Sequence, residues 1–127
     1  MTVSATAADP RPLRLAVYGA GRWGQVLMRN IVAFPDLELA AVISSKPDLS
    51  DAMTLGAPVF DDWRIANSRM KLDGIVLALP PDRQPEIAEE IIKSGLPLFL
   101  EKPLALNNDA ALSLVKVADA SGFVGLV

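Results

Sequence analysis

Three glycines with the spacing GxGxxG lie near the start of the chain, at Gly19, Gly21 and Gly24. They follow an apolar run, 13–18, and precede a helical pattern, 23–33. In a strand–turn–helix unit, the first glycine permits the tight turn, the second lets a pyrophosphate approach the backbone, and the third lets the helix pack closely. Free N–H groups and the positive end of the helix dipole then attract phosphate. This placement favours a nucleotide site over a glycine-rich turn without a ligand.

A second group with chemical potential is Glu101-Lys102-Pro103, directly after the apolar run LPLFL. A lysine at the carboxyl end of a strand, beside a nucleotide, can orient or polarise a substrate, which makes Lys102 the candidate catalytic residue. A desolvated site would also suit it for proton transfer. Glu101 can hold the ammonium in position, and Pro103 fixes the turn. On spacing alone, an exposed Lys–Glu pair in a loop is the simpler interpretation.

The alternation of apolar runs and helical patterns predicts an α/β fold. The uninterrupted apolar sequence GIVLAL is typical of a parallel strand that is buried on both faces. Six strands separated by helices or loops predict a doubly wound parallel sheet, a Rossmann fold, with strand order 3-2-1-4-5-6. The expected strands are 13–18, 37–43, 58–60, 74–79, 96–100 and 123–127.

Ligands of such a sheet bind outside the carboxyl ends of the strands, where the strand order reverses. The glycine turn and the segments 44–46, 79–82 and 101–103 all fall at that rim. Arg22 can add charge or stack on adenine, and Trp23 can pack against the edge of a cofactor. The expected cofactor-binding residues are Gly19, Gly21, Arg22, Trp23, Gly24, Ser44, Ser45, Lys46, Leu79, Pro80, Pro81, Glu101 and Lys102.

Composition excludes several other kinds of chemistry. The 127 residues include no cysteine and no histidine, which rules out disulfides, Ser-His or Cys-His catalysis and a zinc site of the usual type. The net charge of −3, without a basic cluster, argues against a nucleic-acid partner, and no apolar run is long enough for a membrane span. Asp61-Asp62 resembles a metal pair, but helix capping explains both carboxylates, so no metal is expected.

The chain is expected to form a single domain after a short leader. Residues 1–12 are small and polar and carry no export signal, so we expect a loose leader and a cytoplasmic protein. Residues 13–127 are expected to form one cofactor-binding domain. The 51% hydrophobic composition favours a packed core over disorder.

The glycine turn, followed by ALPPD…EIAEEIIKSG…LFLEKPLAL, closely resembles the N-terminal NAD(P)-binding domain of the glucose–fructose oxidoreductase and inositol dehydrogenase family, Gfo/Idh/MocA. The similarity covers 13–127, and its most specific parts are Gly95…Glu101-Lys102-Pro103-Leu104 and Pro80-Pro81-Asp82. The resemblance implies hydride transfer between nicotinamide and a hydroxyl carbon of a sugar, cyclitol or similar small molecule. It also implies that Lys102 lies near nicotinamide and substrate and that Pro80-Pro81 lines the cofactor cleft.

Three features depart from the family pattern. Leu79 stands where the family often has Thr or Asn, which removes a hydroxyl or amide from the cofactor rim. Gln84 stands where the family often has His, and an amide can hydrogen-bond but does not titrate near neutrality. The family's second domain, which supplies the substrate pocket, most of the dimer interface and an acid/base group, has no counterpart in these residues.

The end of the second strand bears on the choice between NAD and NADP. A carboxylate there would bind the adenosine ribose and repel a 2′-phosphate. This chain has Ser44, Ser45 and Lys46 instead, with no carboxylate before Asp48. Two hydroxyls and an ammonium suit a 2′-phosphate, so NADP is favoured over NAD, while an ordinary polar loop is the simpler alternative.

Two interpretations of the whole chain stay open. The favoured one is the cofactor domain of a dehydrogenase, a fragment that is inactive alone because the substrate domain is missing. The alternative is a non-catalytic nucleotide-binding or regulatory module. The face that would meet a second domain is expected to be apolar and uncovered, so a homo-oligomer is predicted.

Overall fold

Six parallel strands form one sheet at the centre of the computed structural model, which describes residues 11–46 and 48–127. Their order is β3-β2-β1-β4-β5-β6, so the predicted doubly wound Rossmann arrangement is confirmed. Most of the expected leader, 1–10, lies outside the described residues. The strands are β1 (Leu13–Tyr18), β2 (Leu37–Ile43), β3 (Val59–Phe60), β4 (Gly74–Leu77), β5 (Leu98–Leu100) and β6 (Gly125–Leu126).

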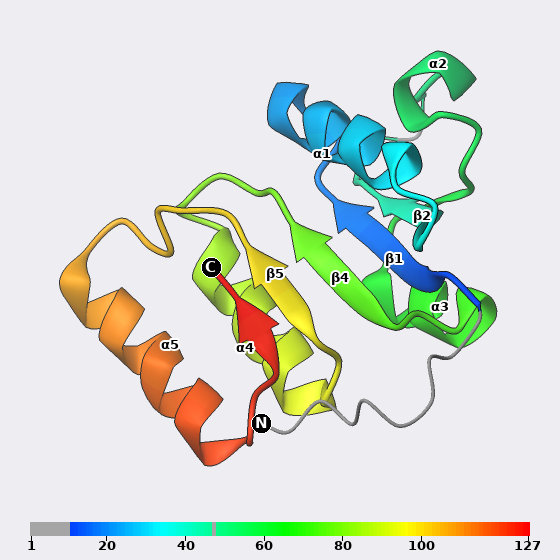
Figure 1. Ribbon diagram of the computed structural model, residues 1–127. Helices are drawn as coiled ribbons and strands as arrows, with labels where there is room; N and C mark the ends of the chain where they lie inside the picture. Colours follow the sequence, from blue (N-terminus) through cyan, green and yellow to red (C-terminus); the bar gives the residue numbers. More distant parts are fainter. Residues whose placement is uncertain (1–10, 47) are drawn as a thin grey trace.

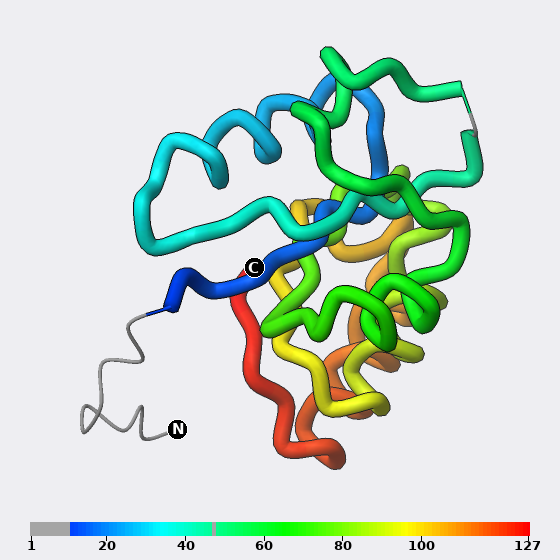
Figure 2. Tube along the Cα trace, turned by 90° about the vertical axis from the view of Figure 1, so that its right-hand side faces the viewer, coloured from blue at the N-terminus to red at the C-terminus, as the bar shows by residue number. Residues whose placement is uncertain are grey.

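Helices lie on both faces of the sheet (Figure 1). On one side are α1 (Arg22–Ala33) and α2 (Asp51–Thr54), and on the other are α3 (Trp63–Met70), α4 (Gln84–Ser94) and α5 (Asn108–Ala120). Figure 2 views the sheet from its side, with α1 on one side and the three later helices opposite. Right-handed crossovers produce this division, because the chain builds outward from β1 first in one direction and then in the other.

The strand β4, at the centre of the sheet, is apolar throughout because helices cover both of its faces. All four residues of β4 are buried. Ile75 packs in the larger core cluster, together with Ile91 of α4, whereas its neighbour Val76 packs on the opposite face with Met28 of α1. Successive residues of a strand point to opposite faces, so the continuous apolar pattern seen in the sequence reflects two cores that share one sheet.

Specific side chains set the ends of several helices. The Asp62 carboxylate caps α3 by accepting the Arg64 N–H at 2.8 Å, and Asn107 caps α5 in the same manner. Gly95, with φ of +88°, ends α4 in the left-handed conformation. Asp61 caps nothing, so the expectation of two capping carboxylates is correct for Asp62 alone.

Four strands are shorter than expected, and β3 lacks only Pro58, which has no N–H to donate. β4 ends at Leu77 rather than at residue 79, ahead of the proline pair. β5 begins at Leu98 rather than at residue 96, because Pro97 has no N–H to donate and Leu96 follows the cap of α4. β6 pairs with β5 only at Gly125 and Leu126, two residues of the expected five.

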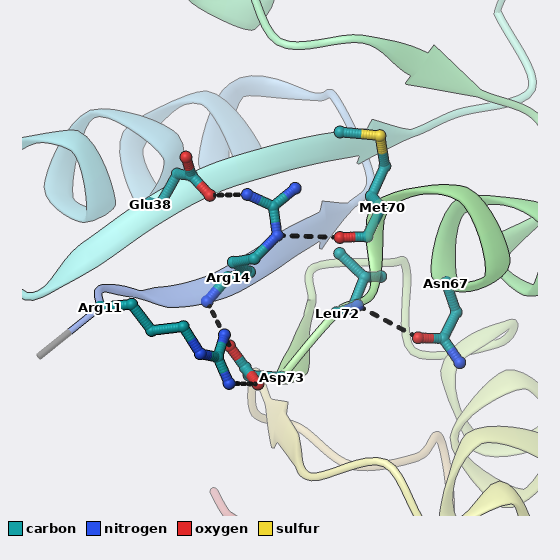
Figure 3. A network of polar contacts seen from close by, with 7 residues as sticks. All are labelled: Arg11, Arg14, Glu38, Asn67, Met70, Leu72 and Asp73. Atoms are coloured by element: carbon teal, nitrogen blue, oxygen red, sulfur yellow. Dashed lines mark hydrogen bonds and ion pairs between the residues drawn. The ribbon is translucent and has the colours of Figure 1, made fainter. Parts of the chain in front are cut away.

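A polar network fastens β1 to its neighbours near the amino ends of the strands (Figure 3). Asp73, between α3 and β4, accepts the Arg14 N–H at 2.8 Å and pairs with the Arg11 guanidinium at 3.0 Å. The Arg14 guanidinium donates to the Met70 carbonyl at 2.8 Å and also pairs with Glu38 of β2. Burial opposes ionisation of Asp73, but the hydrogen bonds from Arg14 and Arg11 outweigh it and lower the pKa of the carboxyl.

Candidate functional site

The loops that follow the strands at the carboxyl edge of the sheet enclose a cavity of about 710 Å³. Backbone pairing continues one residue past the strands and fixes where these loops begin. The Gly19 N–H donates to the Ile43 carbonyl at 2.9 Å, and the Glu101 N–H donates to the Leu77 carbonyl at 3.2 Å. These bonds place the glycine turn and the segment that carries Lys102 on the same rim.

Every residue expected to contact a cofactor lines this one cavity. The residues come from four separate loops, after β1, β2, β4 and β5. A volume of this size is typical of pockets for small molecules and cofactors, about 300–1,000 Å³. The structure thus brings the predicted set together, and the contact that each member makes with a ligand stays a prediction.

The three glycines of the turn have different surroundings. A Cβ on Gly19, where φ is +114°, would lie 2.3 Å from the Ala78 carbonyl oxygen. A Cβ on Gly24 would lie 1.9 Å from the Gly19 carbonyl oxygen, so α1 approaches the turn too closely for any side chain there. Around Gly21, in contrast, nothing lies within 4 Å of the Cβ position. Packing explains Gly19 and Gly24, whereas Gly21 leaves open space beside the cavity.

Helix α1 begins at the cavity with neither a side-chain cap nor an acidic residue in its first turn. The helices α2, α3 and α5 instead start with capping side chains from Ser50, Asp62 and Asn107. The first N–H groups of α1 and the positive end of its dipole are therefore left for an anion.

The charged residues around the cavity are mostly basic. The basic ones are Arg22, Lys46, Arg83 and Lys102, and the acidic ones are Asp61 and Glu101. Because the whole chain has a net charge of −3, this basic excess is a local property of the site. It favours an anionic ligand such as a pyrophosphate.

Tyr18, Asp61 and Arg83 also line the cavity, although the sequence patterns did not predict them as site residues. Tyr18 is the last residue of β1, and its strand-end position was the available signal. Burial raises the pKa of its phenol, and the Arg83 charge opposes that shift without cancelling it. At neutral pH the phenol is therefore a hydrogen-bond donor at the rim.

Asp61 bears on the choice of cofactor. The Ser44 N–H donates to the Phe60 carbonyl at 2.9 Å, so Asp61, which follows Phe60, is close in the sheet to Ser44. The Asp61 carboxylate has no hydrogen bond or ion pair with any described residue. The acidic group that is missing after β2 is thus supplied after β3, beside the segment expected to meet a 2′-phosphate.

The two tryptophans differ in their availability to a ligand. Trp23 lines the cavity and exposes 52% of its surface. Trp63 is 5% exposed in the core, where its Nε1 donates to Glu90 at 3.4 Å and the Arg64 guanidinium lies 4.8 Å from its ring centre. Only Trp23 is placed to meet a cofactor.

Lys102 lies exposed at the edge of the cavity, followed by a cis peptide bond to Pro103. The desolvation expected to tune this lysine is therefore not provided by the described residues. Gln84, which departs from the family pattern, lies outside the cavity and is 1% exposed.

The part of the chain that the structure describes has no group of three or more acidic, cysteine or histidine side chains that could hold a metal ion. Within that same part, every helix is too short or too polar to cross a bilayer.

The chain is similar in sequence to one family of oxidoreductases and to several of its curated relatives. Residues 13–127 match the Gfo/Idh/MocA model, described as an oxidoreductase family with an NAD-binding Rossmann fold. The rhizopine catabolism protein MocA of Rhizobium meliloti is 28% identical over 109 residues, 84% of this chain and 34% of MocA. The inositol 2-dehydrogenase of the same species (strain 1021) is 27% identical over 107 residues, 83% of this chain and 32% of the enzyme.

A similar solved structure is the WlbA dehydrogenase of Chromobacterium violaceum, in complex with NADH and UDP-GlcNAcA. It has a TM-score of 0.85 and 25% identity, covering 100% of this chain and 38% of that protein. The chain therefore spans about a third of the length of the curated relatives that it matches.

Proposed function

The chain belongs to the Gfo/Idh/MocA family of oxidoreductases and matches its NAD-binding Rossmann domain, and from that premise we propose that the cavity described above binds the dinucleotide of a hydride-transferring dehydrogenase. One observation carries the proposal. Four loops that are far apart in sequence converge on one basic cavity, and the uncapped start of α1 opens onto it.

The pyrophosphate is proposed to lie against Gly21, with the first N–H groups of α1 donating to its oxygens. The space left beside Gly21 fits this group, because an atom there approaches the backbone without meeting a side chain. Arg22 adds a positive charge at the same helix end. Gly19 and Gly24 act indirectly, by allowing the turn and the helix to come together.

The adenosine end is proposed to lie at Ser44, Ser45 and Lys46, with NADP favoured over NAD. Two hydroxyls and an ammonium suit a 2′-phosphate. Asp61 works against that preference, because its carboxylate would repel the phosphate and accept a hydrogen bond from a free ribose hydroxyl. The balance between Lys46 and Asp61 therefore sets how strongly NADP is preferred.

The nicotinamide end is proposed to lie along Leu79, Pro80, Pro81 and Glu101. When bound, the nicotinamide ring supplies the hydride chemistry. The ammonium of Lys102 would orient the hydroxyl oxygen of a sugar, cyclitol or similar substrate, and it would stabilise negative charge that develops there. Because the chain spans about a third of its relatives, turnover is proposed for a protein that also carries a substrate domain, and cofactor binding for this domain alone.

A homo-oligomer is proposed through the bare half of the sheet. On the α1 side, the described helices leave β5 and β6 without a covering layer (Figures 1 and 2). An apolar groove of about 520 Å³ lies on that side of the sheet. Leu13 and Leu126 border it and are 50% and 63% exposed. Exposed apolar surface of this kind favours association. Sedimentation velocity should detect a dimer that Leu126→Asp dissociates, and a chain that stays monomeric at high concentration would contradict this proposal.

Titration calorimetry of the chain with NADPH, NADH and ATP tests the proposed function. We expect one dinucleotide per chain, with NADPH tighter than NADH and ATP weaker than both. The melting temperature should rise with each bound ligand, because a ligand that binds only the folded state stabilises it. A folded chain that binds neither dinucleotide would overturn the proposal. Cofactor binding without polyol oxidation in a protein that includes the second domain would favour the regulatory module.

A further inference from the structure

Gln84 begins α4 and is one of the buried polar side chains of the described residues, with 1% of its surface exposed. Its Nε2 donates to the Glu101 carbonyl and, at 3.3 Å, to the Pro103 carbonyl. Two carbonyl acceptors require the –NH2 end of the amide to face the loop. Because Lys102 lies between these residues, one amide bridges the carbonyls of the two residues that flank the lysine.

The loop has few other fixed points. The Glu101 N–H is held by the Leu77 carbonyl at 3.2 Å, but in the described part of the chain residues 102–106 donate no backbone hydrogen bond. The next anchored residue is Asn107, at the cap of α5. Lys102 is exposed and has no hydrogen-bond or ion-pair partner among the described residues. Leu104 packs against the larger core cluster, so the Gln84 bridge and this side chain hold the loop on the two sides of Lys102 and Pro103.

We propose that Gln84 is a positioning residue, which holds Lys102 at the nicotinamide side of the cavity by binding the carbonyls of Glu101 and Pro103. The inference rests on the dinucleotide function proposed above. An amide suits the task because one nitrogen carries two N–H donors without a charge, so both bonds persist across the physiological pH range. A carboxylate only accepts, and each imidazole nitrogen donates at most one hydrogen.

The other end of the amide distinguishes this role from core filling. Gln84 Oε1 is buried and has no partner among the described residues. A buried oxygen without a partner lowers stability, and an apolar side chain of similar size would avoid that loss. Packing alone would therefore be served as well by methionine. What glutamine adds at this position is the pair of bonds to the loop.

Gln84→Met is the decisive variant, because it keeps the buried volume and removes only the bridge. The two lost hydrogen bonds lower stability and the removal of the unpartnered Oε1 raises it, so we expect a melting temperature close to that of the wild type. The 15N order parameter of the Lys102 amide should fall from about 0.85 to below about 0.6 in the cofactor-free chain, whereas that of Leu104, which packs against the core, should change less. Affinity for NADH should fall several-fold, while affinity for ADP-ribose, which lacks the nicotinamide, should not change.

Two further variants complete the test. Gln84→Glu should loosen the loop at high pH, where the carboxylate only accepts, and recover part of the order as the pH falls through the pKa of this buried carboxyl, which burial raises, because the protonated carboxyl regains one donor. Leu114→Ala, a buried change in α5 outside the loop, should lower stability without altering the ratio of NADH to ADP-ribose affinity.

The outcomes separate the two proposals. Unchanged order parameters in Gln84→Met would overturn the bridge. A loosened loop with an unchanged NADH to ADP-ribose ratio would overturn its link to the nicotinamide side. A wild-type chain that binds neither ligand would refute the proposed function instead, and the order parameters would still decide whether Gln84 holds the loop.

Discussion

Replacing Gly21 by alanine should impair dinucleotide binding without unfolding the domain. No atom lies within 4 Å of the added Cβ, and φ of −72° with ψ of −171° is extended backbone that alanine adopts readily. Alanine is about 0.5–1 kcal/mol worse than glycine as an N-cap, but it gains about 0.4–1 kcal/mol by restricting the unfolded chain. These effects nearly cancel, so the melting temperature should move by less than about 5 °C.

The loss should appear in the binding instead. The methyl group occupies the space proposed for the pyrophosphate and separates it from the first N–H groups of α1. A hydrogen bond to a charged group contributes about 1.5–3 kcal/mol, and about 1.4 kcal/mol corresponds to tenfold in affinity. Loss of one such bond should therefore raise the Kd for NADPH and NADH by about 10- to 100-fold in titration calorimetry. Unchanged affinity in a folded Gly21→Ala variant would refute the placement of the pyrophosphate.

Gly24→Ala is the matched control, because the same methyl group meets the fold rather than the ligand. Its Cβ would lie 1.9 Å from the Gly19 carbonyl oxygen, so α1 or the turn must shift. Overpacking of this kind costs about 1–3 kcal/mol, which urea unfolding should detect as a lower midpoint. Equal stability of the two alanine variants would show that the close approach of α1 to the turn is wrong.

Three further outcomes are expected. The pKa of Asp73 is lowered in the folded state, so its contribution to stability is present above pH about 4 and disappears as the pH falls through the lowered pKa. In urea unfolding, Asp73→Asn should therefore be less stable than the wild type at pH 7, and the difference should vanish in acid. Lys46→Ala should lower the affinity for NADPH more than the affinity for NADH, and Asp61→Asn should lower the affinity for NADH more than that for NADPH. If the ratio of the two affinities is unchanged in both variants, these residues do not contact the adenosine end. Ile91→Ala, at a fully buried position of α4, should lower the free energy of unfolding by about 2–5 kcal/mol, and a loss below about 1 kcal/mol would contradict the described core.

The strand order could be predicted because local pattern and topology require the same answer. β4 is apolar at every position, which only a strand with helices on both faces tolerates in water. Short connections and right-handed crossovers then leave one simple order for six strands. The ends of β5 and β6 were harder to predict, because an apolar run continues past the last residue that finds a pairing partner.

The location of the candidate site could also be predicted from topology, whereas several of the residues in and around it could not. Asp61 and Asp62 look alike in the sequence, yet only one residue can occupy the N-cap position, and the other is left beside Ser44. The role of Gln84 depends on the loop at 101–103, far along the chain, and no local pattern reveals such a contact. Local sequence spacing does not predict the role of a residue when that role depends on a contact with a distant loop.

Amide chemical-shift mapping of the 15N-labelled chain during titration with NADPH tests the central claim most directly. We expect the largest shifts at 19–24, 44–46, 79 and 101–102, the segments that share the cavity, and little change at the Asp73 network on the opposite edge of the sheet. Saturation should occur at one dinucleotide per chain. A folded chain that shows no shifts, or shifts centred away from the carboxyl edge of the sheet, would contradict the account.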